Sequence, residues 1–202
     1  MKKSLIMMAV LLMGVMSVVS MYAGNGVSED KASSVLYESA FDVEGTAVNN
    51  YYRSNVRSCK IDGAEWKMTF ACLTAQYVFP GKNSHILASI RKDTKDKAVI
   101  ESGNLLKDNN NVTSFTLKMS SRNKSITGCY CKVEYTVDGS NWMSAGDDFE
   151  PMKGSTSAAD YTFEVNQGET DVFQVRVTFH LNGESYPVHT FFNLDGIKVM
   201  GY

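Results

Sequence analysis

The stretch CKVEYTVDGSNW, residues 131–142, decides the fold class of this chain. Polar residues separate its apolar side chains, which are Cys131, Val133, Tyr135 and Val137. A period of two is typical of a β-strand that buries one face and wets the other. The Asp-Gly pair at 138–139 is a turn former. The stretch therefore predicts one strand of an antiparallel sheet followed by a tight turn.

The same alternation returns along the rest of the chain. It is clear over residues 66–72, 115–119 and 173–179, and weaker over 35–41, 85–90, 98–101, 161–165 and 192–199. A second Asp-Gly pair, at 62–63, is also a turn former. A third, at 195–196, interrupts the last run and indicates a β-bulge. No convincing amphipathic helix appears. We expect an all-β protein with about nine or ten strands in a two-sheet antiparallel β-sandwich.

The first 23 residues have the layout of a secretory signal peptide. Lys2 and Lys3 precede an apolar run over residues 5–19, and small residues follow at Ser20, Ala23 and Gly24. The run is shorter than the roughly 20 apolar residues that span a bilayer. We expect cleavage after Ala23, with an uncleaved anchor as the alternative. Residues 24–202 would then form a single domain without a membrane span. We expect the protein to be secreted, periplasmic or at the cell surface.

Composition excludes several classes of protein. The chain has 202 residues, 44% of them hydrophobic and 11% aromatic, which is too apolar for a disordered protein. Its 20 Lys and Arg against 22 Asp and Glu give a net charge of −2 and no basic cluster for nucleic acid. Nucleic acid is therefore not an expected partner.

Four cysteines allow three full disulfide pairings. Cys129 and Cys131 share one face of a strand at a separation near the upper limit for a bridge. We therefore prefer one bridge between Cys59 or Cys72 and the strand that carries Cys129 and Cys131. The Cys-x-Cys spacing does not match common zinc sites.

Four stretches together resemble a known type of module: AVIESGNLL (98–106), VTSFTLKMS (112–120), CKVEYTVDGSNW (131–142) and FNLDGIKV (192–199). The chain resembles the jelly-roll β-sandwich modules of secreted Bacteroidetes proteins, which are akin to MAM-like, cleaved-adhesin, galactose-binding-like and carbohydrate-binding-module-like domains. The resemblance covers about residues 35–202 as a pattern. It implies a jelly-roll topology and a role in carbohydrate binding or adhesion.

Five residues are candidates for ligand binding. Tyr51, Tyr52 and Arg53 lie in a loop-like region, where binding residues of a rigid sandwich usually sit. Trp142 follows the Asp-Gly turn and could stack on a sugar ring, or it could plug the end of the hairpin against the core. Arg176 occupies the wet face of its strand, where it could bond sugar hydroxyls or form cross-strand ion pairs.

The densest acidic cluster is Asp147, Asp148 and Glu150. Loop oxygens of this kind could hold a calcium ion, although the spacing of an EF-hand is missing. Paired carboxylates could also catalyse glycoside hydrolysis, but that chemistry needs two groups facing one cleft. No other cofactor is expected.

The sequence therefore predicts an exported binding module rather than an enzyme. Its expected partner is a glycan or a cell-surface protein. Two alternatives stay open: a small polysaccharide-active hydrolase or lyase, and a structural subunit of a surface assembly.

Overall fold

The computed structural model describes residues 32–44, 56–75, 78–91, 97–122, 128–152, 157–165, 167–181 and 189–202. In this part of the chain twelve strands form two six-stranded antiparallel sheets. Sheet A holds β1 (Ser34–Ser39), β4 (Ala71–Thr74), β5 (His85–Arg91), β7 (Val112–Ser121), β10 (Ala159–Glu164) and β12 (His189–Gly201). Sheet B holds β2 (Arg57–Ile61), β3 (Ala64–Thr69), β6 (Ala98–Ser102), β8 (Cys129–Thr136), β9 (Met143–Ser144) and β11 (Gln174–Leu181). Among the described residues, no helix has the length and hydropathy to cross a membrane.

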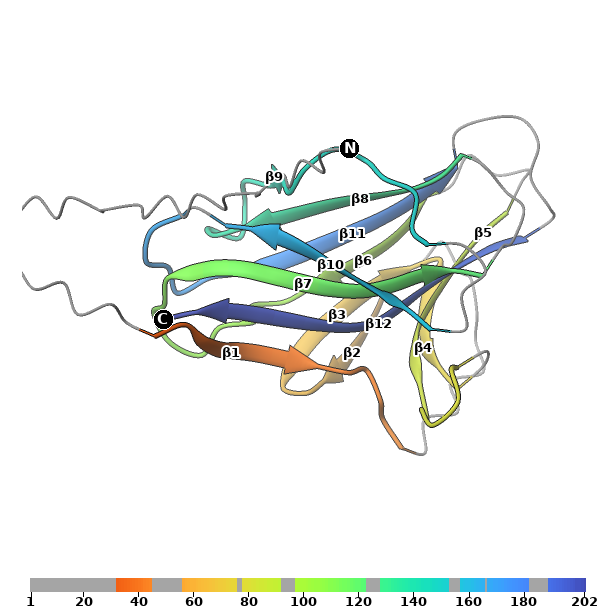
Figure 1. Cartoon of the computed structure of the whole chain (residues 1–202), viewed down its shortest axis with the longest axis horizontal. Coiled ribbons are helices and arrows are strands. Elements are labelled where there is room, and N and C mark those ends of the chain that lie inside the picture. The colour runs from red at the N-terminus through yellow and green to blue at the C-terminus, as the bar shows by residue number, and fades with distance from the viewer. Residues whose placement is uncertain are drawn as a thin grey trace, which may run out of the picture. The chain divides into compact units, whose positions relative to one another are not determined.

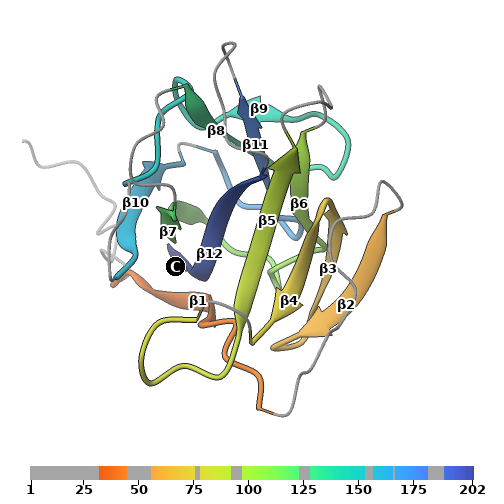
Figure 2. The same cartoon turned by 90° about the vertical axis from the view of Figure 1, so that its right-hand side faces the viewer.

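Sheet A follows the order β10-β7-β12-β5-β4, and sheet B the order β2-β3-β6-β11-β8-β9. The long strand β12 pairs first with β5 and then, past residue 196, with β1 on the same edge. Figure 1 shows β1, β12, β7 and β10 as the front layer, with β3, β6, β11 and β8 behind. The end-on view of Figure 2 separates the two layers. The predicted jelly-roll β-sandwich is confirmed, with twelve strands in the described residues where about nine or ten were expected.

The core lies between the sheets and is built from the predicted alternation. Val133, Val175 and Val177 are at most 3% exposed, and their polar neighbours face outward. Phe179 of sheet B stacks on Phe192 of sheet A, with ring centroids 4.5 Å apart. Aromatic burial of this kind contributes area and a preferred ring geometry. Trp66, expected in the core, is 1% exposed.

The run over residues 66–72 is two strands rather than the single strand that its alternation predicts. Phe70 has φ of +50°, and this kink sends β3 into sheet B and β4 into sheet A. The alternation stops in β4, because Ala71, Cys72, Leu73 and Thr74 are all at most 5% exposed. Residue polarity does not indicate the point at which a chain passes from one sheet to the other.

Turn chemistry is confirmed at two Asp-Gly pairs and the bulge at the third. Asp62 and Gly63 both have positive φ, as the turn between β2 and β3 requires. Gly139 has φ of +73° after β8. The pairing of β12 with β7 shifts register between Leu194 and Gly196, which makes Asp195 the bulged residue.

All four cysteines are free, so the preferred bridge is wrong. Four strand spacings separate β2, which carries Cys59, from β8, about 19 Å in all, and a bridge tolerates about 7 Å between Cα atoms. Cys131 instead lies buried with its Sγ 3.9 Å from Met119 Sδ. Burial raises the pKa of Cys72 to about 12, which keeps that thiol protonated and unreactive.

Candidate functional site

The outer face of sheet B carries two of the predicted ligand residues, and the fold brings them together. The guanidinium carbon of Arg176, on β11, lies 4.1 Å from the centroid of the Trp142 ring. This is cation–π geometry. Arg176 Nε also donates to Glu134 Oε2 at 3.0 Å, and its Nη1 is 3.8 Å from Glu101. One face of the indole is therefore occupied by the protein itself.

Glu134 is the buried centre of this arrangement, which we call the Arg176 network: Glu101, Lys132, Glu134, Trp142 and Arg176. The residue is 9% exposed and also accepts a hydrogen bond from Lys132 Nζ at 2.9 Å. Burial opposes ionisation of its carboxyl, but the hydrogen bonds and charges of Arg176 and Lys132 outweigh that cost and lower its pKa. The charged side chains of the Arg176 network therefore form hydrogen bonds and ion pairs with one another.

A local turn sets the position of Trp142. Asp138 Oδ1 accepts hydrogen bonds from the backbone amides of Ser140 and Asn141, at 2.8 and 2.7 Å, and from the Thr136 hydroxyl at 2.9 Å. Donors to the ionised form lower the pKa of Asp138 far below its usual range, the Asn141 and Ser140 amides contributing most. The Asp-Gly turn predicted from the sequence is thus what carries the indole back over Arg176.

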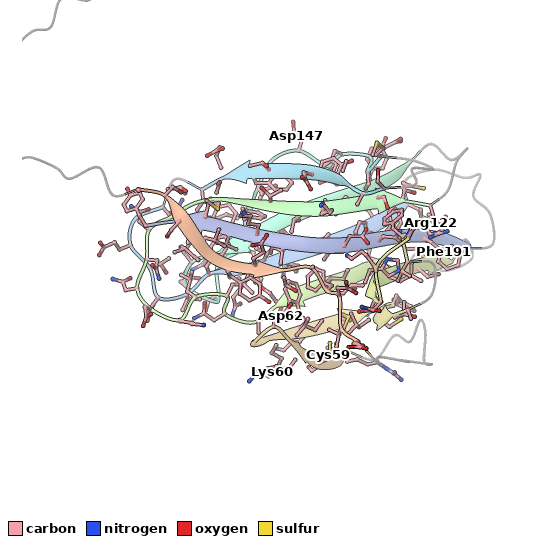
Figure 3. The ribbon with its side chains drawn as sticks, turned by 60° about the horizontal axis from the view of Figure 1, so that its bottom comes forward. Cys59, Lys60, Asp62, Arg122, Asp147 and Phe191 are labelled. Atoms are coloured by element: carbon pink, nitrogen blue, oxygen red, sulfur yellow. The ribbon has the colours of Figure 1, made fainter. Side chains whose placement is uncertain are left out.

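Two of the three acids of the predicted calcium site have separate partners. Asp148 Oδ2 lies 2.7 Å from His180 Nε2, and Glu150 accepts from the amide of Gly128 at 2.7 Å. Figure 3 shows Asp147 pointing away from the sheets, on the opposite side from Cys59. Within the described residues, no group of three or more His, Cys, Asp or Glu is placed to hold a metal ion.

The remaining predicted ligand residues, Tyr51, Tyr52 and Arg53, lie outside the described residues. They stay a prediction from the sequence.

The sequence did not reveal an open cavity of about 700 Å³ on the outer face of sheet A, which we call the sheet A groove. Its floor crosses β1, β12, β7 and β10, the front layer of Figure 1. A volume of this size is typical of small-ligand sites. Hydroxyl and charged side chains line the floor: Glu38, Thr116, Lys118, Asp160, Thr162 and Lys198.

Two rows of cross-strand partners form the floor. In one row, Lys198 faces Glu38 and Thr116, and Thr116 in turn faces Thr162, their hydroxyls 2.9 Å apart. In the other row, Lys118 lies between Gly196 and Asp160. The pairs Lys198–Glu38 and Lys118–Asp160 are both 3.9 Å apart and half-exposed, so they leave donors and acceptors available.

One wall of the groove is the turn from Phe79 to Lys82. Pro80 and Gly81 occupy its centre, Gly81 has φ of +85°, and Lys82 N donates to Phe79 O at 3.2 Å. Proline followed by a glycine with positive φ is the pattern of a type II turn. Phe79 and Pro80 both line the groove and add apolar surface to a polar floor.

Sequence patterns indicate which residues could line this groove, but not that these residues meet. Glu38, Thr116, Lys118, Thr162 and Lys198 occupy wet positions of predicted strands, and Pro80-Gly81 is a turn-forming pair. What the sequence does not contain is the strand order, which places residues 38, 198, 116 and 162 in one row.

No family model and no curated protein matches the sequence. Carbohydrate-binding modules are among the solved structures that are similar to this fold. One is the CBM22-1 xylan-binding domain of Paenibacillus barcinonensis Xyn10C, at 10% identity and a TM-score of 0.46, with 84% of this chain and 96% of that chain covered. CBM35 of the same organism is 14% identical, with a TM-score of 0.44 and coverages of 72% and 97%. TmCBM61, solved with beta-1,4-galactotriose, is 9% identical, with a TM-score of 0.45 and coverages of 68% and 88%.

Proposed function

We propose that this protein is a non-catalytic binding module that takes a carbohydrate in the sheet A groove. The observation that carries the proposal is the groove itself: an open volume of about 700 Å³ with a floor of hydroxyls and loosely paired charges. Sugar hydroxyls both donate and accept hydrogen bonds, so they suit a floor that offers both kinds of partner. Phe79 and Pro80 give the apolar face of a sugar ring a surface to lie against.

A cell-surface protein is a less suitable ligand for this surface. A stable protein interface usually buries about 800 Å² on each partner and has an apolar centre. The groove has a polar centre, and among the large hydrophobic residues described as exposed, Val35, Val56, Met152 and Tyr202, none lines it. Hydroxyls, rather than a partner's apolar side chain, match this floor.

The test is affinity electrophoresis of the chain through gels that contain soluble xylan, β-1,4-galactan or polygalacturonate, followed by titration calorimetry with the polysaccharide that retards it. Replacing both Thr116 and Thr162 by Ala removes two floor hydroxyls from an exposed position. We expect this double variant to weaken binding by about tenfold, the effect of losing one or two good hydrogen bonds.

The matched control removes two hydroxyls from the outer face of sheet B, in the double variant S58A and T69A. Ser58 and Thr69 occupy outward positions of β2 and β3. We expect this control to bind like the wild type. Retardation of the wild type by none of the three polysaccharides, or equal loss in both double variants, would contradict the proposal.

We infer further that the module acts outside the cytoplasm. The support is the layout of residues 1–23, with two lysines, an apolar run and small residues before Gly24. Expression of the full chain in a bacterium, with N-terminal sequencing of the exported protein, is expected to give a chain that begins at Gly24. A protein that keeps Met1 and stays with the cells would contradict this inference.

A further inference from the structure

The internal contacts of the turn Phe79–Lys82 fix its shape, while its place over the groove depends on contacts with other parts of the chain. The amides of Asn83 and Ser84, directly after the turn, donate to Asp42 Oδ1. The internal hydrogen bond of the turn and the Pro80-Gly81 pair determine its shape. They do not determine how far the turn stands from the floor. Pro80 is exposed and Phe79 only partly buried, so apolar packing supplies little of that constraint.

The side chain of Lys82 joins the turn to the floor. Its Nζ donates to Asp195 O at 2.7 Å and to Ala40 O at 2.8 Å, and lies 3.7 Å from Asp195 Oδ1. Ala40 follows the last residue of β1, and Asp195 is the bulged residue of β12. One ammonium therefore ties the wall of the groove to both of the strands beneath it.

Lys82 differs in this respect from the other two lysines of the groove. Its side chain is 21% exposed, compared with 53% for Lys118 and 43% for Lys198. Those two lysines make one ion pair each, at 3.9 Å. Burial, the largest effect on the Lys82 ammonium, lowers its pKa, while Asp195 and Asp42 oppose that shift. The ammonium is thus held in a desolvated position by direct contacts.

The partner carboxylate is itself buried and needs a cation. The Asp195 side chain is 1% exposed, with Oδ1 at 3.3 Å from Nδ1 of the buried His85. Its Oδ2 has no hydrogen-bond partner in the described structure. A buried carboxylate is costly unless it is paired, so Asp195 and Lys82 hold one another in place.

We propose that Lys82 is a positioning residue, which fixes the Phe79–Pro80 turn over the sheet A groove and thereby sets the width of the groove. The expected effect of Lys82 on ligand affinity rests on the proposed carbohydrate function. The effect of Lys82 on the position of the turn does not rest on that function, because its contacts are with other residues of the protein.

The first test measures the turn itself, by hydrogen exchange and mass spectrometry of a peptide that contains residues 78–84. Lys82→Met keeps the length of the side chain and removes its three donors. Segments that lose their anchoring contacts open more often, so we expect faster exchange in this peptide, with unchanged exchange in β7. Lys198→Met, a lysine of the same groove, is the matched control and is expected to exchange like the wild type.

Lys82→Arg separates the charge from the bulk of the side chain. A guanidinium keeps the positive charge and can reach two carbonyl oxygens, so we expect it to restore most of the protection that K82M loses. Equal exchange rates in the wild type and K82M would overturn the proposal. Faster exchange in K198M to the same extent would also overturn it, because any loss of a groove lysine would then suffice.

The second test measures affinity for whichever of xylan, β-1,4-galactan and polygalacturonate retards the wild type. We expect K82M to bind about tenfold more weakly, and K82R to recover most of that loss. Unchanged affinity of K82M would overturn the role of Lys82 in setting the groove, with the carbohydrate function intact. Failure of the wild type to bind any of the three polysaccharides would overturn the carbohydrate function alone, because the exchange comparison then still decides the position of the turn.

Discussion

The two outer faces of this sandwich are both polar, and they differ in what their polar groups contact. On sheet B, Arg176 is held by Glu134 at 3.0 Å and by the Trp142 ring at 4.1 Å. On sheet A, the two ion pairs of the groove floor, Lys198–Glu38 and Lys118–Asp160, are 3.9 Å long and half-exposed. Side chains that satisfy one another contribute to stability, whereas donors and acceptors exposed to solvent can serve a ligand. The comparison therefore fits a stabilising role for the sheet B face and the binding role that we propose for the sheet A groove.

Arg176→Ala should have the largest effect on stability of any surface change on either face. It leaves the buried Glu134 carboxylate with Lys132 as its remaining cation in the Arg176 network and removes the support of Trp142. We expect a loss of about 2 kcal/mol in the free energy of unfolding, the range for hydrogen bonds to charged groups. Urea unfolding measures it. The exposed Lys67→Ala on the same face is the control, and a cost as small as that of Lys67→Ala would refute the stabilising role of the network.

Trp142→Ala sharpens the comparison because Trp142 was a candidate ligand residue from sequence alone. We expect a loss of about 1 kcal/mol from the cation–π contact and the buried ring area, with polysaccharide retardation unchanged. Stability and gel retardation are measured on the same preparation. Full stability with lost retardation would move the binding site from sheet A to sheet B.

For the Asp138 turn we expect a smaller effect on the free energy of unfolding, which appears only at acidic pH. The folded-state pKa of Asp138 lies below its ordinary value of 3.8, so its contribution to stability is present above that pH and is lost as pH falls. We expect the wild type to lose more of its free energy of unfolding than Asp138→Ser between about pH 5 and about pH 2. Parallel losses in the two proteins would show that the turn gains nothing from the ionised carboxylate.

Asp147→Asn and Asp148→Asn should have the smallest effects. Asp147 is exposed, and the Asp148–His180 pair is a surface contact with a side-chain exposure of 41% at the acid, which is worth roughly 0.5 kcal/mol. We expect both variants to keep stability and binding. Release of reducing sugar by the wild type that either variant abolishes would instead establish the hydrolase alternative.

Much of the fold was predictable because the order of apolar and polar residues along a strand indicates which of its side chains are buried. The alternation from Cys131 to Val137 specifies which face of β8 is buried, and the Asp-Gly pairs at 62–63 and 138–139 specify where chains reverse. The split at Phe70 was not predictable, since a left-handed residue is a response to the packing of two sheets. Strand β2 was missed because only five residues form it and its alternation is weak.

The candidate site was predictable in part. Trp142 and Arg176 were both singled out, but their contact with one another was not, because 33 residues of chain and a neighbouring strand lie between them. No sequence pattern singled out Lys82. Its importance arises from Ala40 and Asp195, which are distant in sequence and meet only at the edge where β1 joins β12.

The sequence by itself determined the class of secondary structure, the buried face of most strands and several turns. These properties depend on residues close to one another along the chain, so local patterns suffice to specify them. Only the tertiary structure decided which polar face is internally satisfied, where the groove lies and which lysine holds its wall. Those depend on the order and register of strands, which are set by the packing of the whole sandwich.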